Sequence, residues 1–232
     1  MGEFIKVAMA DGALVETYRA TPQGARRGGI VLLQEIFGLT LHIQEQCDRL
    51  AAAGYEVLAP SLFDRAAPGL RLSYDEAGWK QAITLLRGHA FDLGVDDTAT
   101  CVERLLPAGP VFVLGYCYGG SLAWAAAGRL SGLSGAVCYY GGKLPAIAAQ
   151  PPLCPALVHL GRDDAEIPMR ETRDALERHP AVEVLTYPAG HGFNSDRRPD
   201  FDALSAELAF RETLRFFEKQ ATPLSDTGTP EA

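Results

Sequence analysis

Positive charge and long apolar runs are both scarce in this sequence of 232 residues. It carries 21 lysines and arginines against 29 aspartates and glutamates, which gives a formal net charge of −8. An acidic excess spread along the chain is a poor match for nucleic acid or an anionic membrane surface. No apolar run approaches the roughly 20 residues that a membrane-spanning helix needs. We therefore expect neither a nucleic-acid partner nor a membrane association.

Signal-peptide features are also missing, and cysteine is sparse. The segment Met1 to Lys6 lacks the basic start and apolar block of a signal peptide, so we expect a cytoplasmic location. The five cysteines are an odd, scattered set without a Cys-x-x-Cys pair, which argues against a disulfide framework and against a zinc site. Four of them lie in apolar helix or strand patterns and are expected to be small buried side chains: Cys47, Cys101, Cys138 and Cys154.

Apolar residues make up 47% of the chain, which is ample for a sizeable core. Strand-like and helix-like segments alternate over residues 1–219, and we assign this range to a single domain. Such alternation predicts an α/β fold, with a mostly parallel central sheet and helices on both faces. Residues 220–232 are rich in Thr, Pro and Ser and are predicted to be a disordered tail.

The positions of the elements follow from turn signals and periodicity. The Asp11-Gly12 pair separates two alternating segments, 4–10 and 13–20, and predicts a β-hairpin. Continuous apolar runs typical of buried strands then alternate with amphipathic segments typical of helices. Strands are predicted at 30–34, 55–60, 134–140, 156–160 and 182–187, with another beginning at 111. Helices are predicted around 43–51, 75–86, 95–106, 121–127, 169–178 and 201–219.

The most informative stretch is Gly115-x-Cys117-x-Gly119. It joins a short apolar run to a segment of small helix-forming residues, and strand, tight turn and helix together are typical of a nucleophile elbow. A thiol there would lie at a helix N-terminus, where the dipole favours the thiolate. The backbone N–H of Tyr118 would face a developing oxyanion. A buried cysteine on a glycine-rich turn explains the same pattern.

A candidate acid and a candidate base follow Cys117 along the chain. Asp163 and Asp164 come just after the predicted strand 156–160, and His191 follows the predicted strand 182–187. Nucleophile, acid and histidine in this order are typical of α/β-hydrolases. Loops after parallel strands meet at one edge of the sheet. The pattern therefore favours a hydrolase, with either aspartate as the acid.

Glu35 places a carboxylate at the end of a buried strand, where it is costly unless it is partnered or open to a cleft. It either caps the next helix, pairs with an arginine, or serves as an active-site carboxylate. In the last case the N–H of Ile36 is expected to be a second oxyanion donor, since this loop supplies that donor in α/β-hydrolases.

Four motifs together resemble the dienelactone hydrolase family, from the N-terminal hairpin to the last helix: Gln34-Glu35-Ile36-Phe37-Gly38-Leu39, Gly115-Tyr116-Cys117-Tyr118-Gly119-Gly120, Gly161-Arg162-Asp163-Asp164 with Pro168, and Ala189-Gly190-His191-Gly192-Phe193. The resemblance implies an α/β-hydrolase fold with Cys117 as nucleophile and His191 as base. It favours Asp164 as the acid, because this residue lies four positions before Pro168. It further implies that Glu35 controls the protonation of the thiol and that the N–H groups of Ile36 and Tyr118 form the oxyanion hole.

The activity implied is that of a carboxylic-ester hydrolase that opens a lactone or cleaves an ester without a cofactor or metal ion. The implied partner is a small-molecule substrate, and the implied state is a monomer or small homo-oligomer. In characterised members two arginines bind a substrate carboxylate, but the matching positions here are Trp79 and Ser195, with Arg198 nearby. A more apolar ester or lactone is therefore expected. The predicted pocket residues are Phe37, Trp79, Phe193 and Arg198.

Three alternatives stay open. Trp79 packs in the core as readily as it lines a pocket. The second reading of the activity is a broader esterase or thioesterase that takes a different acyl group. A non-catalytic α/β-hydrolase that binds a small ligand would share the same fold.

Overall fold

The computed structural model describes residues 1–221, and within them eight strands form one sheet in the order β1-β2-β4-β3-β5-β6-β7-β8. The strands from β3 to β8 pair in parallel. β2 joins β4 antiparallel and β1 completes a hairpin at that edge. The bounds are β1 Glu3–Ala8, β2 Leu14–Ala20, β3 Gly28–Leu33, β4 Tyr55–Pro60, β5 Val111–Tyr116, β6 Gly135–Tyr139, β7 Ala156–Gly161 and β8 Val182–Tyr187.

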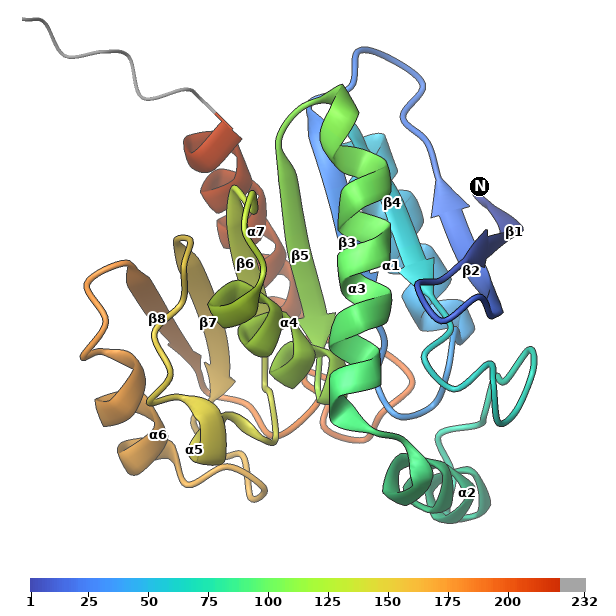
Figure 1. Cartoon of the computed structure of the whole chain (residues 1–232). Coiled ribbons are helices and arrows are strands. Elements are labelled where there is room, and N and C mark those ends of the chain that lie inside the picture. The colour runs from blue at the N-terminus through green and yellow to red at the C-terminus, as the bar shows by residue number, and fades with distance from the viewer. Residues whose placement is uncertain (222–232) are drawn as a thin grey trace, which may run out of the picture.

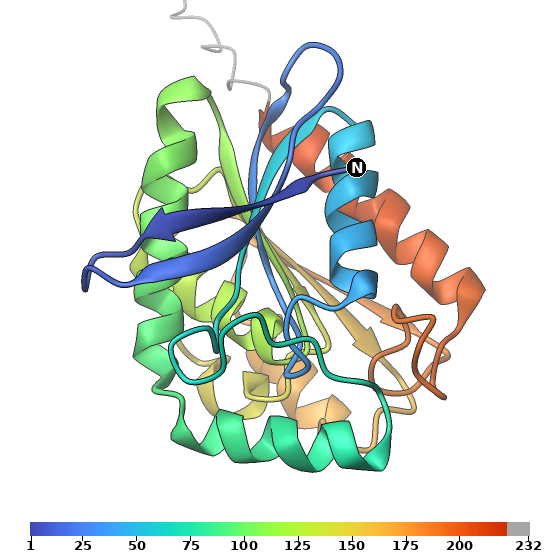
Figure 2. The same ribbon diagram turned by 90° about the vertical axis from the view of Figure 1, so that its right-hand side faces the viewer.

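Helices cover both faces of the sheet (Figure 1). α1 and α7 pack on one face, and α3 and α4 pack on the other, as Figure 2 shows with the sheet seen from its edge. The bounds are α1 Leu41–Ala52, α2 Glu76–Gly88, α3 Phe91–Leu105, the short 3-10 helix η1 Leu106–Ala108, α4 Tyr118–Arg129, α5 Leu144–Ile147, α6 Met169–Leu176 and α7 Ala203–Ala221. The predicted fold class is confirmed.

The core lies where the sequence has its continuous apolar runs. Every residue of β3, β5, β6 and β7 is buried, because helices pack on both faces of these central strands. Cys47, Cys101, Cys138 and Cys154 are buried as predicted. No helix within residues 1–221 is long and apolar enough to cross a membrane.

The differences from the predicted elements are at their ends. α3 begins at Phe91, four residues before the predicted start, and the four-residue helix α5 was not predicted because so short a segment has no periodicity. α7 continues to Ala221. Gln220 and Ala221, predicted as the start of the tail, are therefore helical. The rest of that predicted tail, 222–232, lies outside the described residues.

The helix α2 has an unusual position for the site. It lies across the end of the sheet at which the parallel strands finish, rather than against a face of the sheet (Figure 2). Asp75 begins it, because its side chain accepts a hydrogen bond from the Gly78 N–H at 2.8 Å. Only Gly78 and Ala82 are buried among its residues. Its larger apolar side chains are therefore not part of the core and are available to line a space between the helix and the end of the sheet.

Candidate active site

The elbow predicted from the sequence is present. Cys117 stands between β5 and α4 with φ 54° and ψ −113°, a conformation that costs an L-residue free energy. A Cβ on Gly119 would lie 2.1 Å from the Leu33 carbonyl oxygen, and one on Gly115 would lie 2.0 Å from the Gly119 oxygen. Only glycine therefore lets β5, α4 and β3 approach so closely. The turn holds the Cys117 side chain out of the sheet, partly exposed.

The side chains of Cys117, His191 and Asp164 form a continuous chain of hydrogen bonds. His191 Nε2 lies 3.2 Å from Cys117 Sγ, and His191 Nδ1 lies 2.8 Å from Asp164 Oδ2. The Asp164 side chain is fully buried and that of His191 nearly so. Asp163 is exposed instead, and its backbone N–H donates to the Ala189 carbonyl. The structure thus brings Asp164, and not Asp163, to the histidine.

The protonation of His191 reflects two opposing effects. Burial lowers its pKa, but the hydrogen bonds to Asp164 and Cys117 outweigh burial and raise the pKa to about 10. The imidazole is consequently protonated at neutral pH, with its Nδ1–H donating to the carboxylate and its Nε2–H facing the sulfur. The Tyr140 ring packs edge-on against the imidazole with 5.2 Å between ring centroids. Tyr140 itself has a positive φ of 36°.

Glu35 is completely buried at the end of β3 and has two partners. The Tyr74 hydroxyl donates to Oε2 at 2.9 Å, and Arg198 Nη1 lies 3.3 Å from Oε1. Burial lowers the pKa of Arg198, but the Glu35 carboxylate and the nearby Cys117 and Tyr140 side chains together outweigh burial and leave that pKa above its ordinary value. The arginine pairing left open by the sequence is therefore the one observed. Glu35 is connected to the site through Arg198.

The two candidate oxyanion donors flank the same space as the cysteine. Ile36 and Tyr118 both border the cavity into which Cys117 opens. Within residues 1–221, neither backbone N–H has a backbone hydrogen-bond acceptor outside its own helix or strand. The Tyr118 hydroxyl is held by His89 Nδ1 at 2.9 Å. The arrangement leaves two N–H groups free to bind an oxygen that approaches Sγ.

The cavity at Cys117 has a volume of about 500 Å³. Its walls differ in character. One is apolar, and α2 contributes most of it through Trp79, Ile83 and Leu86. The other carries the polar and charged groups of the site. The residues that line the cavity are Ile36, Phe37, Trp79, Ile83, Leu86, Cys117, Tyr118, Ser121, Gly142, Lys143, Glu166, His191 and Arg198.

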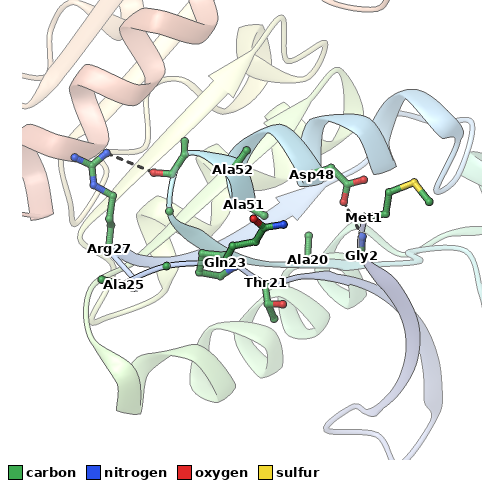
Figure 3. Close-up of a pocket in the computed structure, with 14 residues that line it drawn as sticks. Met1, Gly2, Ala20, Thr21, Gln23, Ala25, Arg27, Asp48, Ala51 and Ala52 are labelled. Carbon is green, nitrogen blue, oxygen red and sulfur yellow. Dashed lines mark hydrogen bonds between the residues drawn. The ribbon is translucent and has the colours of Figure 1, made fainter.

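A second cavity, of about 440 Å³, lies beside α1 (Figure 3). Its walls include Ala25, Arg27 and Gly54, which precede β3 and β4, so it lies at the opposite end of the parallel strands from Cys117. None of its lining residues is a cysteine, serine or histidine. Asp48, its one carboxylate, accepts a hydrogen bond from the Gly2 N–H. The cavity thus has no cysteine or serine nucleophile and no histidine base in its lining.

No cluster of three or more His, Cys, Asp and Glu side chains suited to a metal ion occurs within residues 1–221. The charged groups around Cys117 contact one another instead, as the Glu35–Arg198 pair illustrates.

Comparison with known proteins decides the family. A sequence model of the dienelactone hydrolase family matches residues 15–221. The chain belongs to the dienelactone hydrolase family. Carboxymethylenebutenolidase 1 of Cupriavidus pinatubonensis is 31% identical over 96% of this chain and 99% of its own length. The carboxymethylenebutenolidase of Pseudomonas putida is 32% identical over 92% of this chain and 95% of its own.

Solved structures agree with this membership. The crystal structure of a dienelactone hydrolase homologue from Klebsiella pneumoniae superposes with a TM-score of 0.82 at 26% identity, covering 94% of this chain and 98% of that one. A dienelactone hydrolase-like phosphotriesterase from metagenomic libraries has a TM-score of 0.77 at 22% identity, and covers 95% and 99% of the two chains. The fold of the chain is that of the α/β-hydrolases. Its membership of the dienelactone hydrolase family makes it a carboxylic-ester hydrolase.

The structure places the four predicted pocket residues in different environments. Phe37, Trp79 and Arg198 line the cavity. Trp79 is 51% exposed, so the alternative of a core position is wrong. The prediction for Phe193 is wrong as well, because its ring is fully buried and packs against Tyr140 and Tyr187 behind the histidine loop.

The residues at the site that were not singled out from the sequence include Tyr74, Lys143 and Glu166. Tyr74 and Lys143 lie in segments whose sequence has no catalytic signature, and Glu166 was passed over although it lies only two positions after Asp164. Its spacing to the candidate acid is the one signal that pointed to it.

Proposed function

We propose that this chain hydrolyses small carboxylic esters or lactones through a thiolate at Cys117. The observation that carries the proposal is the unbroken contact from Sγ to His191 to Asp164, placed on a strained elbow at the floor of a cavity. Such a complete constellation speaks against the non-catalytic, ligand-binding alternative, which needs none of these contacts.

In the proposed reaction the Cys117 thiolate attacks the ester carbonyl carbon. The N–H groups of Ile36 and Tyr118 bind the oxyanion, and loss of one such donor typically costs about 100- to 1,000-fold in rate. The His191 imidazolium gives its Nε2 proton to the leaving oxygen as the tetrahedral intermediate collapses. Water, with the now neutral His191 as base, then hydrolyses the thioester.

The shape of the cavity supports an ester with one apolar arm. Trp79, Ile83 and Leu86 offer that arm an apolar wall. Within residues 1–221, an arginine and a lysine line the cavity. Arg198 is engaged by Glu35 at 3.3 Å, and Lys143 lies over the Phe91 ring, with Nζ 5.5 Å from its centroid. A bidentate grip on a substrate carboxylate needs a guanidinium fork free to present two donors. We therefore propose neutral esters or lactones as the preferred substrates.

The proposal is tested by comparing hydrolysis of a dienelactone with that of a neutral aryl ester by the purified chain. Turnover of the aryl ester with weaker turnover of the dienelactone is the expected result. Faster turnover of the dienelactone would support the proposed hydrolysis but contradict the proposed preference for neutral substrates. Turnover of neither substrate would contradict the proposed function.

The pH profile is a further expected result. We expect kcat/KM to fall as the pH rises through about 10, because deprotonation of His191 removes the acid that protonates the leaving oxygen. In Asp164→Asn this alkaline limb should move to lower pH, since the hydrogen bond that raises the pKa of His191 is weakened. Initial rates between pH 6 and 11 measure the alkaline limb in the parent chain and in Asp164→Asn. An identical alkaline limb in the two proteins would contradict the assigned role of His191.

Substitution of Trp79 tests which wall of the cavity meets the substrate. Trp79→Arg should raise the preference for carboxylate-bearing over neutral esters by about 10-fold, because it adds an unpaired guanidinium to the apolar wall. The ratio of kcat/KM for a charged and a neutral aryl ester measures it. Gln81→Arg is the matched control, because Gln81 is exposed on α2 and does not line the cavity. An unchanged ratio in Trp79→Arg would exclude contact with the substrate.

A further inference from the structure

Glu166 is the one carboxylate that lines the cavity at Cys117 within residues 1–221. It lies in the loop after β7, and its backbone N–H donates to Asp164 Oδ1 at 2.8 Å. This bond fixes the start of its side chain relative to the acid of the site. The side chain then extends to the other side of the imidazole, where Oε2 lies 3.5 Å from His191 Nε2.

The same imidazole nitrogen thus faces two groups. Cys117 Sγ is 3.2 Å from Nε2, and Glu166 Oε2 is 3.5 Å from it. The separation of 3.5 Å is long for a direct hydrogen bond, so the carboxylate does not compete strongly with the sulfur for the Nε2 proton. The Glu166 side chain is 58% exposed, and bulk water has access to it. The carboxylate therefore borders the route by which water reaches Nε2.

Water matters most in the second half of the proposed reaction. Once the acyl group is on Cys117, the sulfur no longer carries a negative charge that attracts the Nε2 proton, and neutral Nε2 can accept a proton from water. A water molecule has a second hydrogen, and the best-placed acceptor beside Nε2 is the Glu166 carboxylate. Two acceptors hold the water in one orientation, whereas a single acceptor leaves it free to rotate.

We propose that Glu166 is a positioning residue for the water that hydrolyses the acyl-enzyme. The proposal rests on the thioester route proposed above and deepens it. The water oxygen bonds to the acyl carbon while one proton passes to His191 Nε2, and the second hydrogen stays bonded to oxygen and donates to Glu166. The C–S bond then breaks with its electron pair on sulfur. The products are the carboxylic acid, the Cys117 thiolate and the His191 imidazolium.

The experiment uses 4-nitrophenyl acetate and rapid mixing with the full chain. Release of 4-nitrophenol reports acetylation, and intact-mass measurement of quenched samples reports the acetyl group that remains on the protein. In Glu166→Leu we expect acetylation within about 2-fold of the parent rate and deacetylation slower by about 10- to 100-fold. This loss is smaller than the roughly 100- to 10,000-fold typical of a group that transfers a proton, because Glu166 only orients the water. The acetylated form should then accumulate. Glu166→Gln, which keeps an acceptor oxygen, should be intermediate.

The matched control is Asp163→Asn, which removes a carboxylate from the same loop at an exposed position outside the cavity. We expect both of its rates to equal those of the parent chain. Deacetylation at the parent rate in Glu166→Leu, or an equal fall of both rates, would overturn the role of Glu166. The proposed function would still hold in that case, provided that Cys117 is acetylated. Turnover of the ester without any acetyl group on Cys117, in the parent chain and in Glu166→Leu alike, would overturn the proposed function and this inference together.

Discussion

Replacement of Cys117 by alanine should lower kcat/KM for a neutral aryl ester by at least about 1,000-fold, the scale on which loss of a nucleophile acts in triad hydrolases. The reason is that no other nucleophile borders the cavity in the same setting. Ser121 lines it too, but its Oγ accepts a hydrogen bond from the Lys143 N–H at 3.0 Å and lies one turn along α4. Initial rates with the two proteins at equal concentration measure the effect.

The control for this substitution is Cys154→Ala. Cys154 is buried outside the cavity, so its loss removes a thiol from the chain without touching the site. We expect its kcat/KM to match that of the parent chain. Retention of more than about one tenth of the activity in Cys117→Ala would be incompatible with an effect of the expected size and would exclude Cys117 as the nucleophile.

Asp164→Asn should lower kcat by about 1,000- to 10,000-fold. The carboxylate is fully buried and accepts the Nδ1–H of His191 at 2.8 Å, which fixes the tautomer and the orientation of the ring. An amide in the same place has the shape but lacks the charge that stabilises the imidazolium. Steady-state kinetics over a range of ester concentrations separates the effect on kcat from that on KM.

Asp163→Asn makes the same chemical change one residue earlier, at an exposed position. We expect kcat within about 2-fold of the parent value, since surface substitutions away from a site have small effects. Equal losses in the two variants would leave the acid unassigned. A loss confined to Asp163→Asn would contradict the geometry described above.

The parts of the site that were predictable from the sequence are those set by local chemistry. The glycines around Cys117 are required by a turn whose backbone contacts are 2.0–2.1 Å from any added Cβ, and such a requirement is visible in the residues themselves. The positions of His191 and Glu35 just after predicted strands were likewise visible, because parallel strands finish at one edge of the sheet. The fold class followed from the same alternation of strands and helices.

The parts that were not predictable depend on contacts between distant segments. Glu35 meets Tyr74 and Arg198, which are 39 and 163 positions away, and no local pattern records such pairs. In the sequence Phe193 looks like an aromatic residue of the pocket, because it lies two positions after His191. In the structure its ring points into the core instead. Trp79 shows the converse, since α2 lies across the end of the sheet and leaves the indole half exposed at the cavity.

The choice between the two adjacent aspartates shows the same limit on a smaller scale. Asp163 and Asp164 are equivalent as carboxylates, and the residues alone left both open. Their side chains differ because the turn after β7 buries one and exposes the other. Only the spacing to Pro168 in the family motif favoured Asp164, and the observed 2.8 Å contact with His191 agrees with it.

The central claim is that the reaction passes through an acyl group on Cys117, and one measurement tests it most directly. The chain is mixed with an excess of 4-nitrophenyl acetate, quenched in acid during turnover, digested and analysed by mass spectrometry. The account predicts one acetyl group, located on Cys117 and absent from Cys117→Ala under the same conditions. Turnover in the parent chain with an unmodified Cys117, or with the acetyl group on another residue, would contradict it.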